Sequence, residues 1–262
     1  MLTDHHCHLQ DEKIRPHLKH VLKNAANHDI TSFICCGTKI EDWQEVLGLH
    51  EQYDQIIPAL GIHPWEVKHL SNDWEANLKK NLQDNPNCLV GEIGLDMQFV
   101  KDSIDRQQTV FKTQLQIARG FKRPVAVHNL KTWHLVIPIL KDFKEVTIML
   151  HSYSASLKIT DQLLALPNIY FSFSGAILDH PKKALPEALN KIPHNRLLLE
   201  TDSPYLLPKI DEVKNQAYNE PANMIFVLEK IAEIKKLDID ALKKQLAENS
   251  QRFLHHLATS DL

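Results

Sequence analysis

Short runs of apolar and β-branched residues alternate with amphipathic stretches along the whole chain. This alternation predicts repeated βα units rather than strands and helices segregated into separate blocks, and it places the chain in the α/β class. Eight of the runs have the length and composition of strands: Leu2 to Cys7, Ser32 to Cys36, Ile56 to Ile62, Cys88 to Ile93, Pro124 to His128, Val146 to His151, Ile169 to Ser174 and Arg196 to Thr201.

The stretches between these runs have the periodicity of helices. In Asp105 to Gly120, apolar residues recur at helical spacing and the final glycine is a natural C-terminal stop. After the eighth run, two further helices are expected at Pro221 to Lys236 and Ile239 to Leu257. Asp238 and Asp240 stand where N-caps are expected.

An open doubly wound sheet would also fit alternating βα units, but it usually has fewer strands and often a glycine-rich phosphate loop after the first strand. The chain has only seven glycines, no G-x-G-x-x-G or Walker loop, and a first run that ends in histidines. Its 262 residues suit one α/β barrel. We therefore expect one (β/α)8 TIM-like barrel domain over residues 1–262, with extra C-terminal helices.

Composition narrows the classes of function. A formal net charge of −3 argues against a protein that holds long nucleic acid on a broad basic face, although it leaves open an enzyme acting on nucleic-acid ends. No stretch resembles a secretion signal or a membrane span, so we expect a cytoplasmic location and no membrane partner. The cysteines form no C-x-x-C pair, which favours reduced thiols on buried strands: Cys7, Cys35, Cys36 and Cys88.

Two histidines at the end of the first run form the first candidate metal site. Strand alternation places Asp4, His6 and His8 on one face, with His5 on the other. Paired imidazoles there could hold a divalent metal, with Asp4 behind them to orient a ring. Taken alone, such a pair is more often two partly buried histidines bonded to neighbouring groups.

Glu92 lies in the fourth run, in an otherwise apolar segment with Gly91 and Gly94 nearby. A buried glutamate needs a partner, which could be a cation or a barrel Lys or Arg, and the glycines leave room for a cation. His128 and His151 end the fifth and sixth runs, and Asp202 follows the eighth. Each could be a satisfied core histidine or an N-cap, but a His or an acid at five strand ends is best explained by one shared metal site.

The sequence also resembles the TatD family from end to end. The resemblance rests on motifs in the family's order and spacing: Asp4-x-His6-x-His8, Gly61-Ile62-His63-Pro64, Gly91-Glu92-Ile93-Gly94-Leu95-Asp96, Thr201-Asp202-Ser203-Pro204-Tyr205 and Asn219-Glu220-Pro221-Ala222-Asn223. It implies a barrel of the amidohydrolase superfamily with metal-dependent deoxyribonuclease activity, often as a 3′ to 5′ exonuclease. DNA, either single-stranded or at its ends, would be the substrate, and no obligate protein partner is expected.

The resemblance also implies roles for individual residues. Two divalent cations (Mg, Mn or Zn) would activate a shared water, which Asp202 would orient and deprotonate. His63 would contact the scissile phosphate or aid proton transfer, unless the His-Pro turn is structural. The implied ligands are His6, His8 and Asp202 for one metal, His128 and His151 for the other, and Glu92 as a bridge between them.

The sequence departs from the family pattern where substrate is held. Gln10 replaces a common Asp, and Asn129-Leu130-Lys131 follows His128 where the family commonly has Ser-Arg. Lys131 would then supply the lost charge at the substrate, as a point charge without the arginine fork. Ala155 replaces the usual glycine, and Tyr218 stands where a basic residue is common.

Two other classes of function remain open on the sequence alone. One is a hydrolase of the same superfamily that acts on a small ester, lactone or amide, because one fold and metal site serve many chemistries. The other is a non-enzymatic metal-binding scaffold in a defence or repair assembly. Glu92, where a carboxylated lysine would suit the small-molecule hydrolases, speaks mildly against the first.

Overall fold

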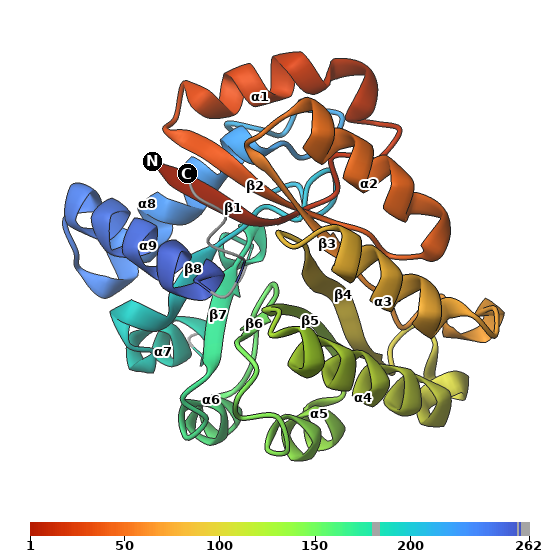
Figure 1. Cartoon of the computed structure of the whole chain (residues 1–262). Coiled ribbons are helices and arrows are strands. Elements are labelled where there is room, and N and C mark those ends of the chain that lie inside the picture. The colour runs from red at the N-terminus through yellow and green to blue at the C-terminus, as the bar shows by residue number, and fades with distance from the viewer. Residues whose placement is uncertain (180–183, 256, 258–262) are drawn as a thin grey trace.

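A computed structural model describes residues 1–179, 184–255 and 257. Its eight strands form one parallel sheet in sequence order, with helices around it, which confirms the predicted TIM-like barrel (Figure 1). The strands are largely buried, and most of them are apolar, whereas the first one carries Thr, Asp and two His. The strands are β1 (Leu2–Cys7), β2 (Ile30–Cys36), β3 (Ile56–Leu60), β4 (Leu89–Asp96), β5 (Val125–Leu130), β6 (Ile148–Leu150), β7 (Ile169–Phe173) and β8 (Leu197–Leu199).

The helices outside the barrel bury one apolar face against the strands. The helix expected at Asp105 to Gly120 is α4, and it ends with Lys122 in the left-handed conformation at φ 54°. The helices are α1 (Leu18–Ala26), α2 (Ile40–Gln52), α3 (Trp74–Asp84), α4 (Ile104–Phe121), α5 (Trp133–Leu140), α6 (Leu157–Leu164), α7 (Ala184–Lys191), α8 (Met224–Lys235) and α9 (Ile239–Leu254).

The ends of several elements differ from the prediction. β4 continues to Asp96, and the short strands β6 and β8 stop before His151 and Asp202, which therefore lie on loops beyond the ladder. The helix expected from Pro221 begins as a 3-10 turn at Pro221–Asn223 and becomes helical as α8. Asp238 caps α9 by accepting a hydrogen bond from the Ala241 amide, whereas Asp240 lies inside its first turn.

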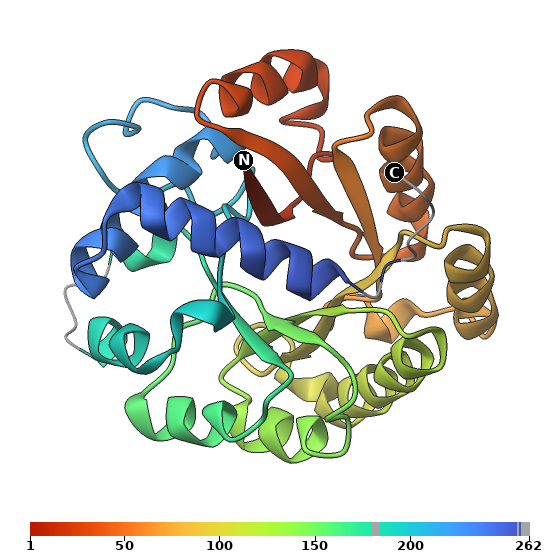
Figure 2. The same cartoon turned by 60° about the vertical axis from the view of Figure 1, so that its left-hand side comes forward.

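The N-terminal mouth of the barrel is closed by α9, which crosses it in Figure 2. Phe253 of α9 is fully buried and packs with inward-facing strand residues such as Ile34, Met149 and Leu198. Ser250 of α9 shares a 2.9 Å hydrogen bond with Nε2 of His5, so His5 faces away from the predicted metal site, as expected. Within the residues that the structure describes, the interior is therefore a packed core that is covered by α9 at its N-terminal end and faces the carboxyl ends of the strands.

Backbone hydrogen bonds beyond the strand ends join β8 to β1. The amide of Asp202 donates to the carbonyl of His6 at 2.9 Å, and the amide of His8 donates to the carbonyl of Ser203 at 2.7 Å. These bonds hold the segment that carries Asp202 against the segment that carries the two histidines. The backbone itself therefore sets the relative positions of three predicted ligands.

Asp4 also joins β1 to the segment that follows β8, a junction called here the β8–β1 seam. Its predicted role, to orient a ligand ring, was wrong. Its carboxylate accepts hydrogen bonds from the Thr201 amide at 3.0 Å and the Thr201 hydroxyl at 2.5 Å, and it does not orient a ligand ring. The pairing of β1 with β2 is also irregular between Asp4 and Cys7. Asp4 is fully buried, and burial raises its pKa to about 8 despite the Thr201 hydrogen bonds.

The four cysteines are free and buried, as the sequence predicted. Among the residues described, no helix combines the length and hydropathy needed to cross a bilayer.

Candidate metal centre

The six predicted ligands converge at the carboxyl ends of the strands. His6 belongs to β1, Glu92 to β4 and His128 to β5, while the other three follow the ends of β1, β6 and β8. Active-site groups of barrels sit at this face because the strand ends and the following loops meet there. All six have polar atoms within 3.9 Å of another member of the set: His6, His8, Glu92, His128, His151 and Asp202.

The Oε2 atom of Glu92 faces one group of ligands. It lies 3.2 Å from Nε2 of His6 and 3.8 Å from Nε2 of His8. The same two nitrogens lie 3.6 Å and 3.4 Å from Oδ1 of Asp202, and 3.3 Å from each other. His6, His8 and Asp202 thus surround one small space beside this oxygen.

The Oε1 atom of Glu92 faces a second group. It lies 3.0 Å from Nδ1 of His128 and 3.3 Å from Nε2 of His151. His63, which the sequence assigned to substrate contact, places its Nε2 3.6 Å from the same oxygen, so it is as near to Glu92 as the predicted ligands are. The two oxygens of one carboxylate therefore each have their own set of imidazoles.

These separations fit bound divalent cations. Ligand atoms about 2.1 Å from a tetrahedral metal are roughly 3.4 Å from one another, close to the spacings within each group. Among the described residues, three sets have donor atoms that all lie within 4.8 Å of one another: His6 with His8 and Asp202, His6 with Glu92 and His151, and His63 with Glu92 and His128. The donor set of imidazoles and carboxylates suits Zn and Mn, while Mg prefers more oxygen.

Three of the imidazoles are held from behind, a feature that the sequence analysis missed. Nδ1 of His8 lies 2.8 Å from the carbonyl oxygen of Cys36, and Nδ1 of His6 lies 3.4 Å from the Cys36 thiol. Nδ1 of His151 lies 2.9 Å from Oε1 of Glu200. Such contacts fix a ring and leave its Nε2 free to bind a metal. Cys36 thus orients both His6 and His8.

His128 has a different partner. Its Nε2 lies 3.4 Å from Oδ2 of Asp96, the buried residue that ends β4, and its Nδ1 faces Glu92. Oδ2 of Asp96 also accepts a 2.7 Å hydrogen bond from the indole nitrogen of Trp65. Asp96 was visible in the sequence motif around Glu92, but nothing there pointed to this contact.

The glycines beside Glu92 serve the packing of strands rather than space for a cation. A Cβ at Gly94, whose φ is 152°, would lie 1.9 Å from the carbonyl oxygen of His128. A Cβ at Gly91 would lie 2.8 Å from the Cβ of Ala126. β4 and β5 therefore approach closely only because glycine stands at these positions, and this approach brings Glu92 and His128 together.

Charge within the cluster is balanced by protonated imidazoles. Burial would lower the pKa of His8, but Asp202 raises it to about 9, and against the same burial Glu200 and Glu92 raise the pKa of His151 to about 10. Burial would raise the pKa of Glu92, yet His6 and His151 hold it well below its usual value. The carboxylates are thus anionic, and cation binding must release protons from the imidazoles.

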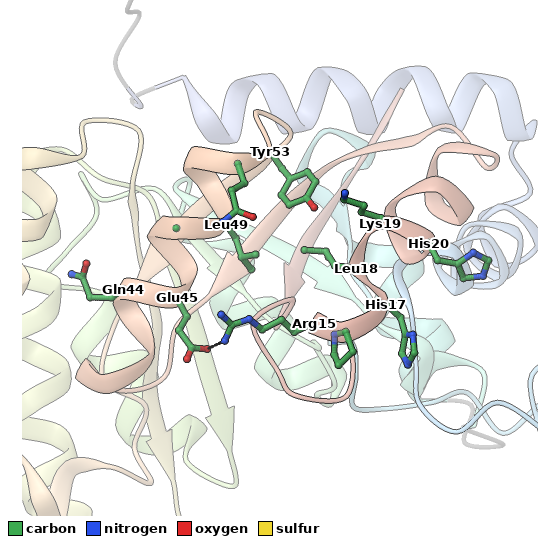
Figure 3. Close-up of a pocket in the computed structure, with 12 residues that line it drawn as sticks. Arg15, His17, Leu18, Lys19, His20, Gln44, Glu45, Leu49 and Tyr53 are labelled. Carbon is green, nitrogen blue, oxygen red and sulfur yellow. Dashed lines mark ion pairs between the residues drawn. The ribbon is translucent and has the colours of Figure 1, made fainter.

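Lys131, the predicted substrate-binding cation, follows β5 directly and is exposed, with a φ of 60°. A surface groove lies elsewhere, between η1 (Arg15–His17) with α1 and the helix α2 (Figure 3). It has a volume of about 650 Å³ and is crossed by an ion pair of 3.2 Å between Arg15 and Glu45. No member of the ligand cluster lines it.

Comparison with known proteins agrees with this geometry. A family model described as TatD related DNase matches residues 3–255. The chain belongs to the TatD family. It is 29% identical over 254 residues to YabD of Bacillus subtilis, an uncharacterised metal-dependent hydrolase, with 96% of this chain and 98% of YabD covered. YcfH of Escherichia coli K12, also an uncharacterised metal-dependent hydrolase, is 29% identical over 259 residues, with 97% of this chain and 96% of YcfH covered.

A solved structure of a TatD homologue, YJJV of E. coli K12, superposes with a TM-score of 0.89 at 26% sequence identity. The match covers 96% of this chain and 97% of YJJV. The protein is therefore a metal-dependent hydrolase of the TatD family with an amidohydrolase-like barrel.

Two TatD motif positions act in this chain as structural braces. Asn219 is buried, and its side-chain amide donates to the carbonyl of Thr201 at 2.8 Å, which steadies the loop that carries Asp202. Gln10, which departs from the family pattern, donates to the Cys36 carbonyl at 2.8 Å and accepts from the Cys35 thiol at 3.1 Å. Gln10 therefore supports the residue that orients His6 and His8.

Proposed function

We propose that this TatD protein is a deoxyribonuclease that hydrolyses phosphodiester bonds in single-stranded DNA or at DNA ends, from the 3′ side, with two divalent cations bound. The observation that carries the proposal is the position of Glu92 between two groups of imidazoles, one beside each carboxylate oxygen. Such an arrangement suits a carboxylate that bridges two cations. Paired metals recur in enzymes that cleave phosphate esters.

The cations would be held by His6, His8 and Asp202 on one side and by His128 and His151 on the other, with His63 able to join the second group. When bound there, the cations would lower the pKa of a water toward about 7 and would stabilise negative charge on the leaving oxygen. The chain itself supplies the base. Burial would raise the pKa of Asp202, but His8, His151 and His6 lower it, so its carboxylate is ionised and can accept a proton from water.

Substrate contacts are proposed for two residues. Burial lowers the pKa of His63 to about 3, so it presents a neutral imidazole and acts as a hydrogen-bonding or ligating group rather than as a charged phosphate clamp. Lys131 is exposed directly after β5, three residues beyond His128 in the chain, and would supply the positive charge that attracts a phosphate.

The runner-up is hydrolysis of a small ester, lactone or amide at the same metal centre. A screen separates the candidates: bis-p-nitrophenyl phosphate, a lactone and end-labelled single-stranded DNA, each with added Mg, Mn or Zn. We expect turnover of the diester and of DNA. Turnover of the lactone alone would reverse the ranking, and tight metal binding without turnover of any ester would favour the scaffold.

Glu92→Ala is the matched test of the bridging role. The variant is expected to lose bound metal, measured by elemental analysis after dialysis, together with all diesterase activity. Lys144→Ala, an exposed position in the loop before β6, is purified in the same way as a control and should keep the metal content and activity of the wild type. If Glu92→Ala kept both its metal content and its activity, the two-cation proposal would be wrong.

A further inference from the structure

Exposed aromatic side chains gather around the mouth of the metal centre. Among the residues described, the large hydrophobic side chains that are exposed include three aromatics: Trp65 at 48%, Phe99 at 64% and Tyr205 at 46%. They follow β3, β4 and β8, the strands that also carry or precede His63, Glu92 and Asp202. Aromatic rings left in water around a cleft are characteristic of ligand-binding surfaces rather than of packing.

Trp65 and Phe99 form one unit fixed to the metal cluster. Their rings contact edge to face, with centroids 5.5 Å apart at 77°. The buried carboxylate of Asp96 holds both residues, because Oδ2 accepts from the Trp65 indole at 2.7 Å and Oδ1 accepts from the Phe99 amide at 2.9 Å. The Trp65 ring also contacts His63, with centroids 4.9 Å apart.

Tyr205 is engaged differently. Its hydroxyl donates to Oδ2 of Asp11 at 2.7 Å, and the ammonium of Lys13 lies 5.5 Å from the centre of its ring. Part of the Tyr205 side chain is therefore already in contact with the loop that follows β1. Phe99 has Trp65 as its one ring contact among the described residues, so most of its surface faces solvent.

We infer that Trp65 and Phe99 form a stacking platform for an unpaired base next to the scissile phosphate. This inference rests on the proposed nuclease function and specifies its substrate. Every base has a flat π-face, so such a platform accepts any sequence. A base inside a duplex already has both faces stacked, so the platform selects a frayed or single-stranded end.

The test compares two short oligothymidylates, one of them with abasic residues at its 3′ end. Wild-type protein is expected to cleave the intact strand with kcat/KM at least about fivefold higher than the abasic strand, through a lower KM, as removal of one base–aromatic stack predicts. In Phe99→Ala this ratio should fall toward one, and Phe99→Trp should restore it. Ile239→Ala, an exposed apolar position on α9, should keep the wild-type ratio.

A binding measurement separates this inference from the nuclease proposal. Fluorescence anisotropy with the same labelled strands in EDTA reports affinity without turnover. If the wild type cleaved no DNA yet bound the intact strand more tightly than the abasic one, and Phe99→Ala abolished the difference, the nuclease proposal would fail and the platform would stand. If Phe99→Ala kept the wild-type ratio in both assays, the platform would be refuted.

Discussion

Oε1 of Glu200 lies 2.9 Å from Nδ1 of His151, and the same oxygen accepts a hydrogen bond of 2.6 Å from the Ser152 amide. Glu200 is fully buried, and its other carboxylate oxygen has no hydrogen-bond partner among the described residues. Burying an ionisable carboxyl group with one unpaired oxygen costs free energy of folding, so such a group is expected to have a role in positioning a neighbour. Here it fixes the ring whose Nε2 faces Glu92.

Glu200→Gln should therefore weaken metal binding without removing a ligand. The amide keeps the size of the side chain but loses the charge that holds the His151 ring, and changes of this kind typically cost about 10- to 100-fold in metal affinity. Competition with a fluorescent chelator measures the effect. Glu145→Gln, an exposed acid paired with Arg119, should bind metal like the wild type; equal affinities for all three proteins would contradict the role given to Glu200.

Asp202→Asn should separate binding of metal from catalysis. An amide retains an oxygen ligand but cannot accept a proton, so kcat for the diester should fall about 10²- to 10⁴-fold while much of the bound metal remains. Steady-state kinetics measures kcat, and elemental analysis of the same preparation measures the bound metal. Turnover at the wild-type rate with metal in place would show that another group is the base.

Lys131→Ala should raise KM for single-stranded DNA and leave kcat for a small diester within a few-fold. Loss of one phosphate contact should also reduce the slope of log binding constant against log salt by about 0.7. The salt dependence of binding in EDTA measures this directly. Lys144→Ala removes a lysine from a loop before β6, at the other end of the strands, and should leave the slope unchanged.

Thr201→Val should destabilise the seam between β8 and β1. The substitution removes the hydroxyl that donates to Asp4 and leaves a buried carboxylate oxygen without that donor, at a cost of about 1–3 kcal/mol. Urea denaturation measures the free energy of unfolding. Thr109→Val, whose hydroxyl bonds to a helix carbonyl at the surface of α4, should change it by no more than about 0.5 kcal/mol.

Metal removal should lower thermal stability. A cation at about 100 times its dissociation constant stabilises the folded state by about 2.7 kcal/mol, which corresponds to a shift on the order of 5–10 °C in Tm for a chain of this size. Differential scanning calorimetry with EDTA and with added Mn or Zn tests this. Glu92→Ala should show no metal-dependent shift, and a comparable shift in that variant would place the stabilising cation elsewhere.

The strand-end residues could be predicted because barrel geometry brings distant positions together. Glu92 and His128 stand out in the sequence as polar residues in apolar runs, and His6 as one of a pair of alternating histidines, and closure of the sheet then brings the three together. This argument needs only the number and order of the strands. It works even where strand ends shift, as for His151 and Asp202.

The groups that orient the ligands could not be predicted in the same way. Cys36 acts partly through its backbone carbonyl, and a carbonyl leaves no mark in a sequence. Glu200 was visible as an acid beside Asp202, yet its partner His151 lies 49 residues away. Asp4 was misassigned because its carboxyl group accepts hydrogen bonds from Thr201, a residue 197 positions away in the sequence.

Because α9 covers the N-terminal end of the barrel, the metal centre is reached from the opposite end. With Phe253 packed among the inward-facing strand residues, the described part of the chain leaves no second entrance to the barrel, and a DNA strand cannot be threaded through it. Whatever reaches the metal centre must approach and depart across the same rim of loops. Immobilising the protein through the outer surface of α9 would therefore leave every substrate route unobstructed.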